Sequence, residues 1–477
     1  MIPKNIVKRL KLICWVMLWM SNAVIPCALA EESLTYDQAR QRLRLQSDAI
    51  KAANYQVQGE RETRQSLDSL RYPTLSIDAG VMAYSLQREM NIEPLQEAVG
   101  ELISGADQLI PSTVNLDFNS VDPTAALTSS WLLYNGGQTS AARQFADASI
   151  TLAEAQRTGT IEHQDKMLAI VYFGHLLAGR VLAIREEVLE SVKRHLYQAT
   201  RFEDKGVLSK VERLHAQVAY DEARRNLVQA RSDYGIADVS LRRLLHSEQS
   251  IVLQTQLFVI TQALPSLGEF IDAGIDDNSQ LAQLRAKHRQ AEQGKAIEQA
   301  RWKPSVVAYG SYNLVQKDAD FSNPLPLLEP DWIVGINISY PIFDRLNRGR
   351  LVGAAEQKVQ RVQALSRELE TNLTTLIEKS YLSVKRARQQ FLLLQSNIEL
   401  TQETLKLRER LFAEGLGTSL DVIDAQLTVA RAETERVSAA YAFVVSLANL
   451  LEASGQLEKF SDYIARADVK LTAGEHQ

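Results

Sequence analysis

The chain has 477 residues, 45% hydrophobic and 23% charged, which excludes both an intrinsically disordered protein and one built from many membrane-spanning helices. Its 58 acidic residues outnumber 53 basic ones, and the net charge of −5 argues against nucleic-acid binding, which needs a basic surface. With only 12 prolines and 22 glycines, turns are few for this length and long helices are expected.

Residues 1–30 have the pattern of a secretory signal peptide. Basic residues are followed by an apolar stretch from Leu12 to Met20 and by the cleavage sequence Ala28-Leu29-Ala30. A retained membrane anchor is the alternative. Because Cys14 and Cys27 both lie in this segment, the mature chain is expected to have no thiol, and the sequence does not decide whether Cys27 is lipidated.

The distribution of proline divides the mature chain into alternating segments. No proline lies between Pro123 and Pro265 or after Pro341, and these stretches accommodate very long helices because an interior proline costs about 3 kcal/mol. An internal repeat accompanies this alternation. At one common displacement, Ser130–Asn135 matches Ser339–Asp344 and Gly206–Gln217 matches Gly415–Gln426.

We therefore predict a mainly α-helical protein with a membrane β-barrel part, built from a duplicated strand-strand-long helix-helix repeat. The first half holds about 22 extra residues between its strands, expected to form a loop insertion. The first repeat is predicted at 31–246, with strands at about 74–86 and 124–134 and helices at about 137–203 and 209–246. An equatorial linker follows at 247–277. The second repeat is predicted at 278–455, with strands at about 305–315 and 331–343 and helices at about 349–413 and 419–454, and a C-terminal tail at 456–477 ends the chain.

The predicted strands alternate in polarity. In residues 74–85 and 331–340 one set of alternate positions is apolar and the other is mixed, which is typical of strands. About ten residues per strand suffice for a tilted crossing of a bilayer. A soluble antiparallel sheet is the alternative. Aromatic residues in or beside the strands are candidates for the membrane interface, namely Trp131, Tyr134, Trp302, Trp332 and Tyr340.

The helical segments carry heptad repeats. From Leu420 to Leu451 apolar residues follow alternating steps of three and four, and a second apolar stripe runs beside the first from Ala425 to Ala453. Two stripes imply neighbours on two sides of the helix, as in a wall of helices.

A compact turn separates the long and the shorter helix of each half. Gly206 and Gly415 suit the left-handed conformation that ends a helix. Ser209 with Glu212, and Thr418 with Asp421, are predicted to form capping boxes that begin the next helix. Asp424 is not needed for capping, and its alternative role is that of an ordinary solvated helix residue.

The sequence shows no catalytic constellation. Its seven histidines lack zinc-protease spacing, and Gly136-Gly137 has no phosphate-loop continuation. We therefore expect neither an enzyme nor a metal or cofactor site.

Taken together, these motifs resemble those of the TolC-like outer-membrane efflux channel family over nearly the whole mature chain. The resemblance rests on Leu34–Ala39, Arg71-Tyr72-Pro73, Leu133–Gly137, Ile342-Phe343-Asp344 and above all the two glycine turns ending in Ala216-Gln217 and Ala425-Gln426. It implies a homotrimer with one shared twelve-stranded β-barrel in the lipid of the outer membrane, continued by a long periplasmic α-helical barrel. A single chain's four strands would not close a barrel alone.

The resemblance also implies a passive exit duct of a tripartite efflux or type I secretion system, opened when a periplasmic adaptor and an inner-membrane pump dock. Asp421 and Asp424 match the family's aspartates at the pore constriction, whereas Phe412 and Gly417 stand where well-known members have a tyrosine and an arginine that lock the tip. Adaptor docking is expected at the turn residues Gly206, Ser209, Glu212, Gly415, Gly417 and Thr418. A periplasmic coiled-coil adaptor or scaffold without a pore is the alternative, and the sequence identifies neither the substrate nor the pump class.

Overall fold

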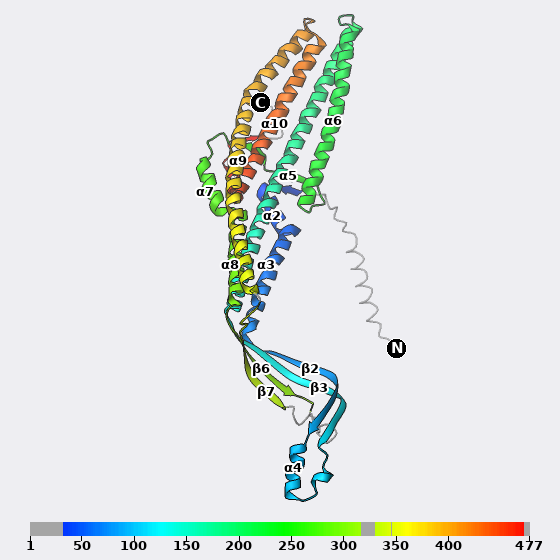
Figure 1. Cartoon of the computed structure of the whole chain (residues 1–477). Helices are drawn as coiled ribbons and strands as arrows, with labels where there is room; N and C mark the ends of the chain where they lie inside the picture. The colour runs from blue at the N-terminus through cyan, green and yellow to red at the C-terminus, as the bar shows by residue number, and fades with distance from the viewer. Residues whose placement is uncertain (1–31, 316–329, 345, 472–477) are drawn as a thin grey trace, which may run out of the picture. The chain divides into compact units, whose positions relative to one another are not determined.

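The computed structural model describes residues 32–315, 330–344 and 346–471, so the expected signal peptide lies outside the described residues. The chain divides into two compact units, each assembled from separated parts of the sequence. Unit one comprises Met1–Ala52, Arg157–Ser279 and Glu370–Gln477, and unit two comprises Ala53–Gln156 and Gln280–Leu369. Figure 1 shows the elements in chain order.

Unit two contains one antiparallel sheet of four strands in the order β2-β3-β6-β7. Its strands are β2 (Thr74–Asn91), β3 (Thr113–Asn135), β6 (Ser305–Asn313) and β7 (Trp332–Ser339). Among the described residues, β2 and β7 each pair on one side only, so both edges of the sheet are open.

The pairing register sorts the side chains of this sheet by polarity. Ile77 pairs with Leu127, Leu127 with Tyr312 and Tyr312 with Trp332, so one row of large apolar side chains crosses all four strands on one face. Ile77 and Trp332 are 69% and 65% exposed. The opposite face carries a polar network, in which the Thr128 hydroxyl lies 2.7 Å from that of Ser76 and donates to Asp78 at 2.6 Å. One face therefore suits hydrocarbon and the other suits water.

The extra residues of the first half do not form the simple loop expected. β2 runs on to Asn91 and β3 starts at Thr113, with Asn91 paired to Thr113. Between them lie the helix α4 (Glu93–Leu102), with a proline in its first turn, and the short η2 (Asp107–Leu109). Continued antiparallel pairing satisfies backbone N–H and C=O groups that in an open loop would have to bond to water.

Long helices make up most of the chain. α5 (Gln138–Asp204) and α9 (Asn347–Ala413) each have 67 residues, and α6 (Lys210–Leu244) and α10 (Ser419–Ala453) each have 35. The two halves of the duplicated sequence therefore form helices of the same lengths. Unit one holds the α5–α6 and α9–α10 turns, and unit two holds most of α3 (Asp48–Ser66) and of α8 (Ser279–Ala300).

The remaining elements of unit one surround an aromatic core. Rings of Tyr36, Phe173, Phe258 and Phe460 pack with centroids 5.2–6.2 Å apart. The expected linker and tail contribute ordered elements here, because parallel β1·β4 and antiparallel β5·β8 pairings join distant parts of the chain. These elements are β1 (Glu32–Leu34), α2 (Tyr36–Gln46), β4 (Ile251–Leu253), β5 (Leu257–Val259), α7 (Leu267–Asp277), η4 (Leu457–Lys459), α11 (Phe460–Ala465) and β8 (Val469–Leu471).

Part of α5 is apolar and long enough to cross a membrane by length and composition alone. Leu168, Tyr172 and Phe173 on this helix are nevertheless fully buried in unit one. These three residues of the apolar stretch therefore belong to a protein core.

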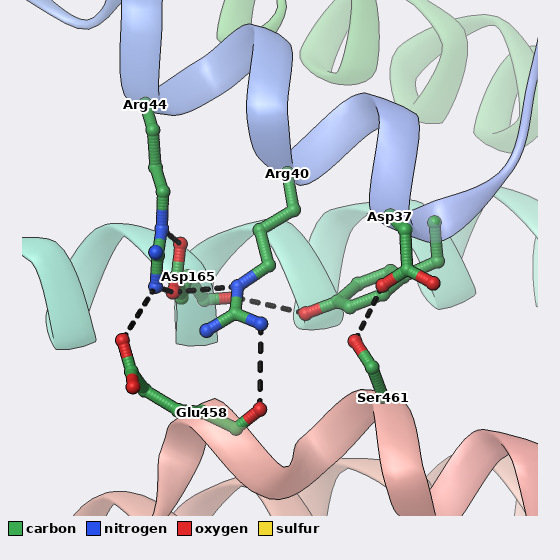
Figure 2. Close-up of polar contacts among 7 residues, drawn as sticks. Asp37, Arg40, Arg44, Asp165, Glu458 and Ser461 are labelled. Carbon is green, nitrogen blue, oxygen red and sulfur yellow. Dashed lines mark hydrogen bonds and ion pairs between the residues drawn. The ribbon is translucent and has the colours of Figure 1, made fainter.

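A buried carboxylate fastens α2 to α5 (Figure 2). Asp165, whose side chain is 2% exposed, accepts from Arg40 Nε at 2.8 Å and from Arg44 Nε at 3.2 Å. Arg44 also pairs with the Glu458 carboxylate at 3.5 Å. Two guanidinium groups compensate the desolvation that burial imposes on the single carboxylate. The N-terminal helix and the C-terminal η4 are thus held against α5.

Candidate functional site

Both helical hairpins turn through the same backbone geometry. Gly206 and Gly415 have φ of 70° and 75°, in the left-handed region that favours glycine. After Gly206, Val207 donates to the Phe202 carbonyl at 2.9 Å, and after Gly415, Leu416 donates to the Leu411 carbonyl at 2.9 Å. A Cβ at either glycine would meet no atom within 4 Å, so only backbone conformation demands glycine at these two positions.

The shorter helices begin with side-chain caps of unequal completeness. Thr418 forms the predicted capping box, since its hydroxyl accepts from the Asp421 amide at 3.2 Å while its own amide donates to the Asp421 carboxylate at 3.2 Å. Ser209 accepts from the Glu212 amide at 3.5 Å, but no return bond from Ser209 to Glu212 is formed. The capping box predicted at Ser209 is therefore only half present.

Glu212 reaches across to the other hairpin instead. Its Oε2 accepts from the Ser419 backbone amide at 2.8 Å. Ser419 is the first residue of α10, and its amide is one of the donors that a helix start leaves without an intrahelical acceptor. The carboxylate satisfies this donor and ties the tip of α6 to the start of α10.

The two candidate pore aspartates have different surroundings. Hydrogen bonds from Thr418 and the charge of Arg408, whose Nη1 lies 3.2 Å from Asp421 Oδ1, lower the pKa of Asp421 below its usual value. Asp424 is exposed, and the structure gives its carboxylate no partner among the described residues. Asp421 therefore has a compensated charge, whereas the carboxylate of Asp424 has no basic partner among the described residues.

A small core lies beneath the two turns. Phe412 is 2% exposed and packs with Ala199, Ala216, Val422 and Ile423, so the core draws on all four helices of the two hairpins. A Cβ at Gly417 would lie 3.1 Å from the Phe412 amide nitrogen, which leaves no easy room for a side chain there. Phe412 thus fills a packed position, and Gly417 permits the chain to pass close to it.

His195 of α5 lies against Phe412, with ring centroids 4.6 Å apart. Its Nε2 is buried without a hydrogen-bond partner among the described residues. Burial lowers the pKa of His195 from 6.5 to about 4, and the Glu212 carboxylate opposes this shift only in part. The imidazole is therefore neutral at physiological pH and belongs to the tip core.

Four of the five aromatic residues proposed for the membrane interface lie at one end of the sheet, where strands join helices. A β-bulge between Leu132 and Tyr134 brings Trp131, paired with Ala308, and Tyr134, paired with Val306, to the same face although they are three residues apart. The indole of Trp131 donates to the Arg71 carbonyl at 2.9 Å. Trp332 lies at the other end of β7.

Trp302 and Tyr340 are brought together by an arginine that the sequence reasoning missed. The Arg348 guanidinium lies 4.6 Å from the centre of the Trp302 ring and 5.9 Å from that of Tyr340. Arg348 also pairs with Asp344 at 3.0 Å and donates to the Arg301 carbonyl at 3.3 Å. The sequence gives one signal for it, a basic residue four positions after an acid at a predicted helix start.

The structure brings the turn residues of the two hairpins together and places the interface aromatics elsewhere, in unit two. Glu212 and Arg408 gain partners that only tertiary packing supplies, so sequence spacing gave no indication of them. No group of three or more histidine, cysteine, aspartate or glutamate side chains suited to a metal ion occurs in the part of the chain that the structure describes.

A family model described as Outer membrane efflux protein matches residues 39–246 and 271–456. No curated protein is significantly similar in sequence. Among solved structures, VceC of Vibrio cholerae is 14% identical with a TM-score of 0.68, covering 88% of this chain and 96% of VceC. The CmeC channel of Campylobacter jejuni is 12% identical with a TM-score of 0.68, covering 91% and 90%. The open-state MtrE channel of Neisseria gonorrhoeae is 17% identical with a TM-score of 0.67, covering 88% and 89%.

At these identities the structural matches establish the fold alone. The family model covers both halves of the duplicated chain, which confirms the resemblance drawn from the sequence, and the protein belongs to the outer membrane efflux protein family.

Proposed function

We propose that three copies of this chain form a passive exit duct, closed at the helix tips and opened by docking of a periplasmic adaptor and an inner-membrane pump. Membership of the family makes the protein an outer-membrane channel of tripartite efflux systems, not an enzyme. The trimer, the position of the gate and the docking residues go beyond what family membership gives.

The observation that carries the proposal is the open amphipathic sheet. Its apolar row crosses four strands, yet within the described part of the chain β2 and β7 each leave one edge unpaired. Unpaired backbone groups are not tolerated in the hydrocarbon of a bilayer, and four strands are too few to close on themselves. Pairing of β7 with β2 of the next copy removes every edge, and three copies give a barrel of twelve strands.

The carboxylates at the start of α10 support a gate at the tips. In a threefold assembly Asp421 and Asp424 of three chains supply six carboxylates around one axis. Such a ring favours cations and binds divalent ions or polyamines. The turn residues Gly206, Ser209, Glu212, Gly415, Gly417 and Thr418 lie on the same tips, and we assign adaptor docking to them.

The proposal is tested by extraction and reconstitution. The mature protein is expected to fractionate with outer membranes, to migrate as a trimer in mild detergent and to conduct ions in planar bilayers. A soluble periplasmic monomer would contradict both the trimer and the barrel. A trimer that does not conduct, even when the adaptor is present, would contradict the duct alone.

A further inference from the structure

The sheet of unit two has a helix end, where β2 and β6 begin and β3 and β7 end. We call this region the collar and define it as residues 67–73, 298–304, 341–344 and 346–350. It holds five basic and three acidic side chains, so it is locally basic in a chain whose net charge is −5.

The charges of the collar are unevenly compensated. Each acid already has a basic partner: Asp68 with Arg143 at 3.3 Å, Glu298 with Arg301 at 3.2 Å, and Asp344 with Arg348. Three exposed basic residues have no ion pair with any acid among the described residues, namely Arg71, Lys303 and Arg350. These three cations are available to an anion that the described residues do not supply.

Large apolar side chains lie beside these cations. Ile342, Phe343 and Leu346 in the connection from β7 to α9 are 88%, 78% and 73% exposed, and Tyr72 is 72% exposed. Leu346 has φ of 63°, a left-handed conformation that is unusual for a residue with a side chain. Backbone strain of this kind persists only where the surrounding structure imposes it. Here the strained residue is one whose apolar side chain is exposed.

The collar is also pre-organised and not a loose set of side chains. Arg348 is buried beside the rings of Trp302 and Tyr340. It forms an ion pair with Asp344 and donates a hydrogen bond to the Arg301 carbonyl. The Trp131 indole donates a hydrogen bond to the Arg71 carbonyl. A Cβ at Gly136 would lie 2.5 Å from the Ala300 carbonyl, so the turn after β3 packs directly against the segment that leads to Lys303. The cations are thus carried on fixed backbone.

We propose that the collar binds anionic phospholipids of the periplasmic leaflet, with Arg71, Lys303 and Arg350 contacting the phosphates and Ile342, Phe343 and Leu346 entering the acyl region. The inference rests on the proposed membrane barrel, because the collar continues the apolar face of the sheet to its helix end. Aromatic residues favour the boundary between hydrocarbon and headgroups, and basic residues next to it attract anionic lipids. Cations that flank exposed apolar side chains match both parts of a phospholipid.

The test measures lipid retention by native mass spectrometry of the detergent-purified protein after addition of phosphatidylglycerol or phosphatidylcholine. Wild type is expected to retain phosphatidylglycerol preferentially. The triple variant Arg71→Gln, Lys303→Gln, Arg350→Gln is expected to lose about a hundredfold in phosphatidylglycerol affinity, roughly fivefold per cation, with phosphatidylcholine affected little. The variant Phe343→Ser should weaken retention of both lipids and keep the preference.

A matched control removes three exposed basic residues elsewhere, Arg194, Arg224 and Lys358, and should retain lipid as wild type does. Equal retention of both lipids by wild type, or an equal loss in this control, would overturn the inference. So would competition by soluble glycerophosphate, which would indicate a simple phosphate site. Dissociation of the trimer in the collar variant with unchanged lipid binding would show instead that the collar joins two copies.

Conductance is recorded with the same preparations. A wild-type channel that conducts without any lipid preference refutes the lipid site and leaves the duct intact. Loss of conductance in wild type refutes the proposed function itself. The two failures are therefore separable.

Discussion

At the scale of single residues, equivalent positions of the duplicated chain have acquired different roles. Glu212 and Asp421 both lie three residues after a helix cap, yet Asp421 turns back to Thr418 while Glu212 bonds Ser419 in the other hairpin. Glycines and caps were predictable because their chemistry is local. The partner of Glu212 was not, since it depends on which helix packs alongside.

Asp424→Asn tests the pore assignment without disturbing the cap. Its carboxylate is exposed and has no partner among the described residues, so the free energy of unfolding should change by less than about 0.5 kcal/mol. We expect a several-fold lower cation selectivity and weaker divalent block in planar bilayers, with normal trimers. Asp421→Asn serves as comparison, because it also removes the ion pair with Arg408 and the charge that strengthens the bonds from Thr418. Unchanged selectivity and block in Asp424→Asn would place the constriction elsewhere.

His195 should make the stability of the tip pH-dependent. Its folded-state pKa of about 4 lies below the ordinary 6.5, so the unfolded state binds the proton first as pH falls. Stability is therefore complete above pH 6.5 and declines toward pH 4, by at most about 3 kcal/mol. Hydrogen exchange of the amides of residues 196–216 between pH 7 and pH 4 measures this decline. After correction for intrinsic exchange, the exchange rates of the variant His195→Phe should depend much less on pH than those of wild type. The same pH dependence in both proteins would contradict the role of His195 in the stability of the tip.

At the scale of elements, the two hairpin turns are defined by backbone conformation and the four strands by register. The turns were predicted closely because a left-handed glycine followed by a cap is a short-range signal. The extension of β2 to Asn91 was missed because its alternation fades near Gln87-Arg88-Glu89, and pairing with β3 supplies what the sequence pattern lacks. The linker and tail strands were missed because their partners lie far away along the chain.

Gly206→Val and Gly415→Val should each strain a left-handed position by about 1 to 2 kcal/mol, since no neighbouring atom otherwise opposes a side chain there. We expect loss of export with normal insertion of the sheet into the membrane, measured by substrate accumulation and by the amount of trimer. Gly235→Val in α6 is the matched control, because that glycine also has open space around it but an ordinary φ. Full export by both turn variants would argue against docking at the tips.

At the scale of the whole molecule, composition already indicated long helices, and proline placement divided them from the strands. The four-strand sheet with its two open edges could be predicted because alternation and strand count are visible in the sequence. The stacking of Arg348 on Trp302 could not be predicted, because no periodic sequence pattern marks a residue whose role depends on rings from other segments. The family match over residues 39–246 and 271–456 bears out the fold.

The hydrogen bond that the Ser419 amide donates to Glu212 affects how a partner would meet the helix tips. In the proposed trimer, three copies of the duplicated chain would present six hairpin ends in a ring of approximate sixfold symmetry. Glu212 accepts a hydrogen bond from the other hairpin, whereas Asp421 accepts one from its own hairpin. The six ends would therefore alternate between two different surfaces. A docking partner that surrounded the proposed ring with six identical subunits would therefore meet two inequivalent contacts, and we expect half of its subunits to bind with a different affinity from the other half.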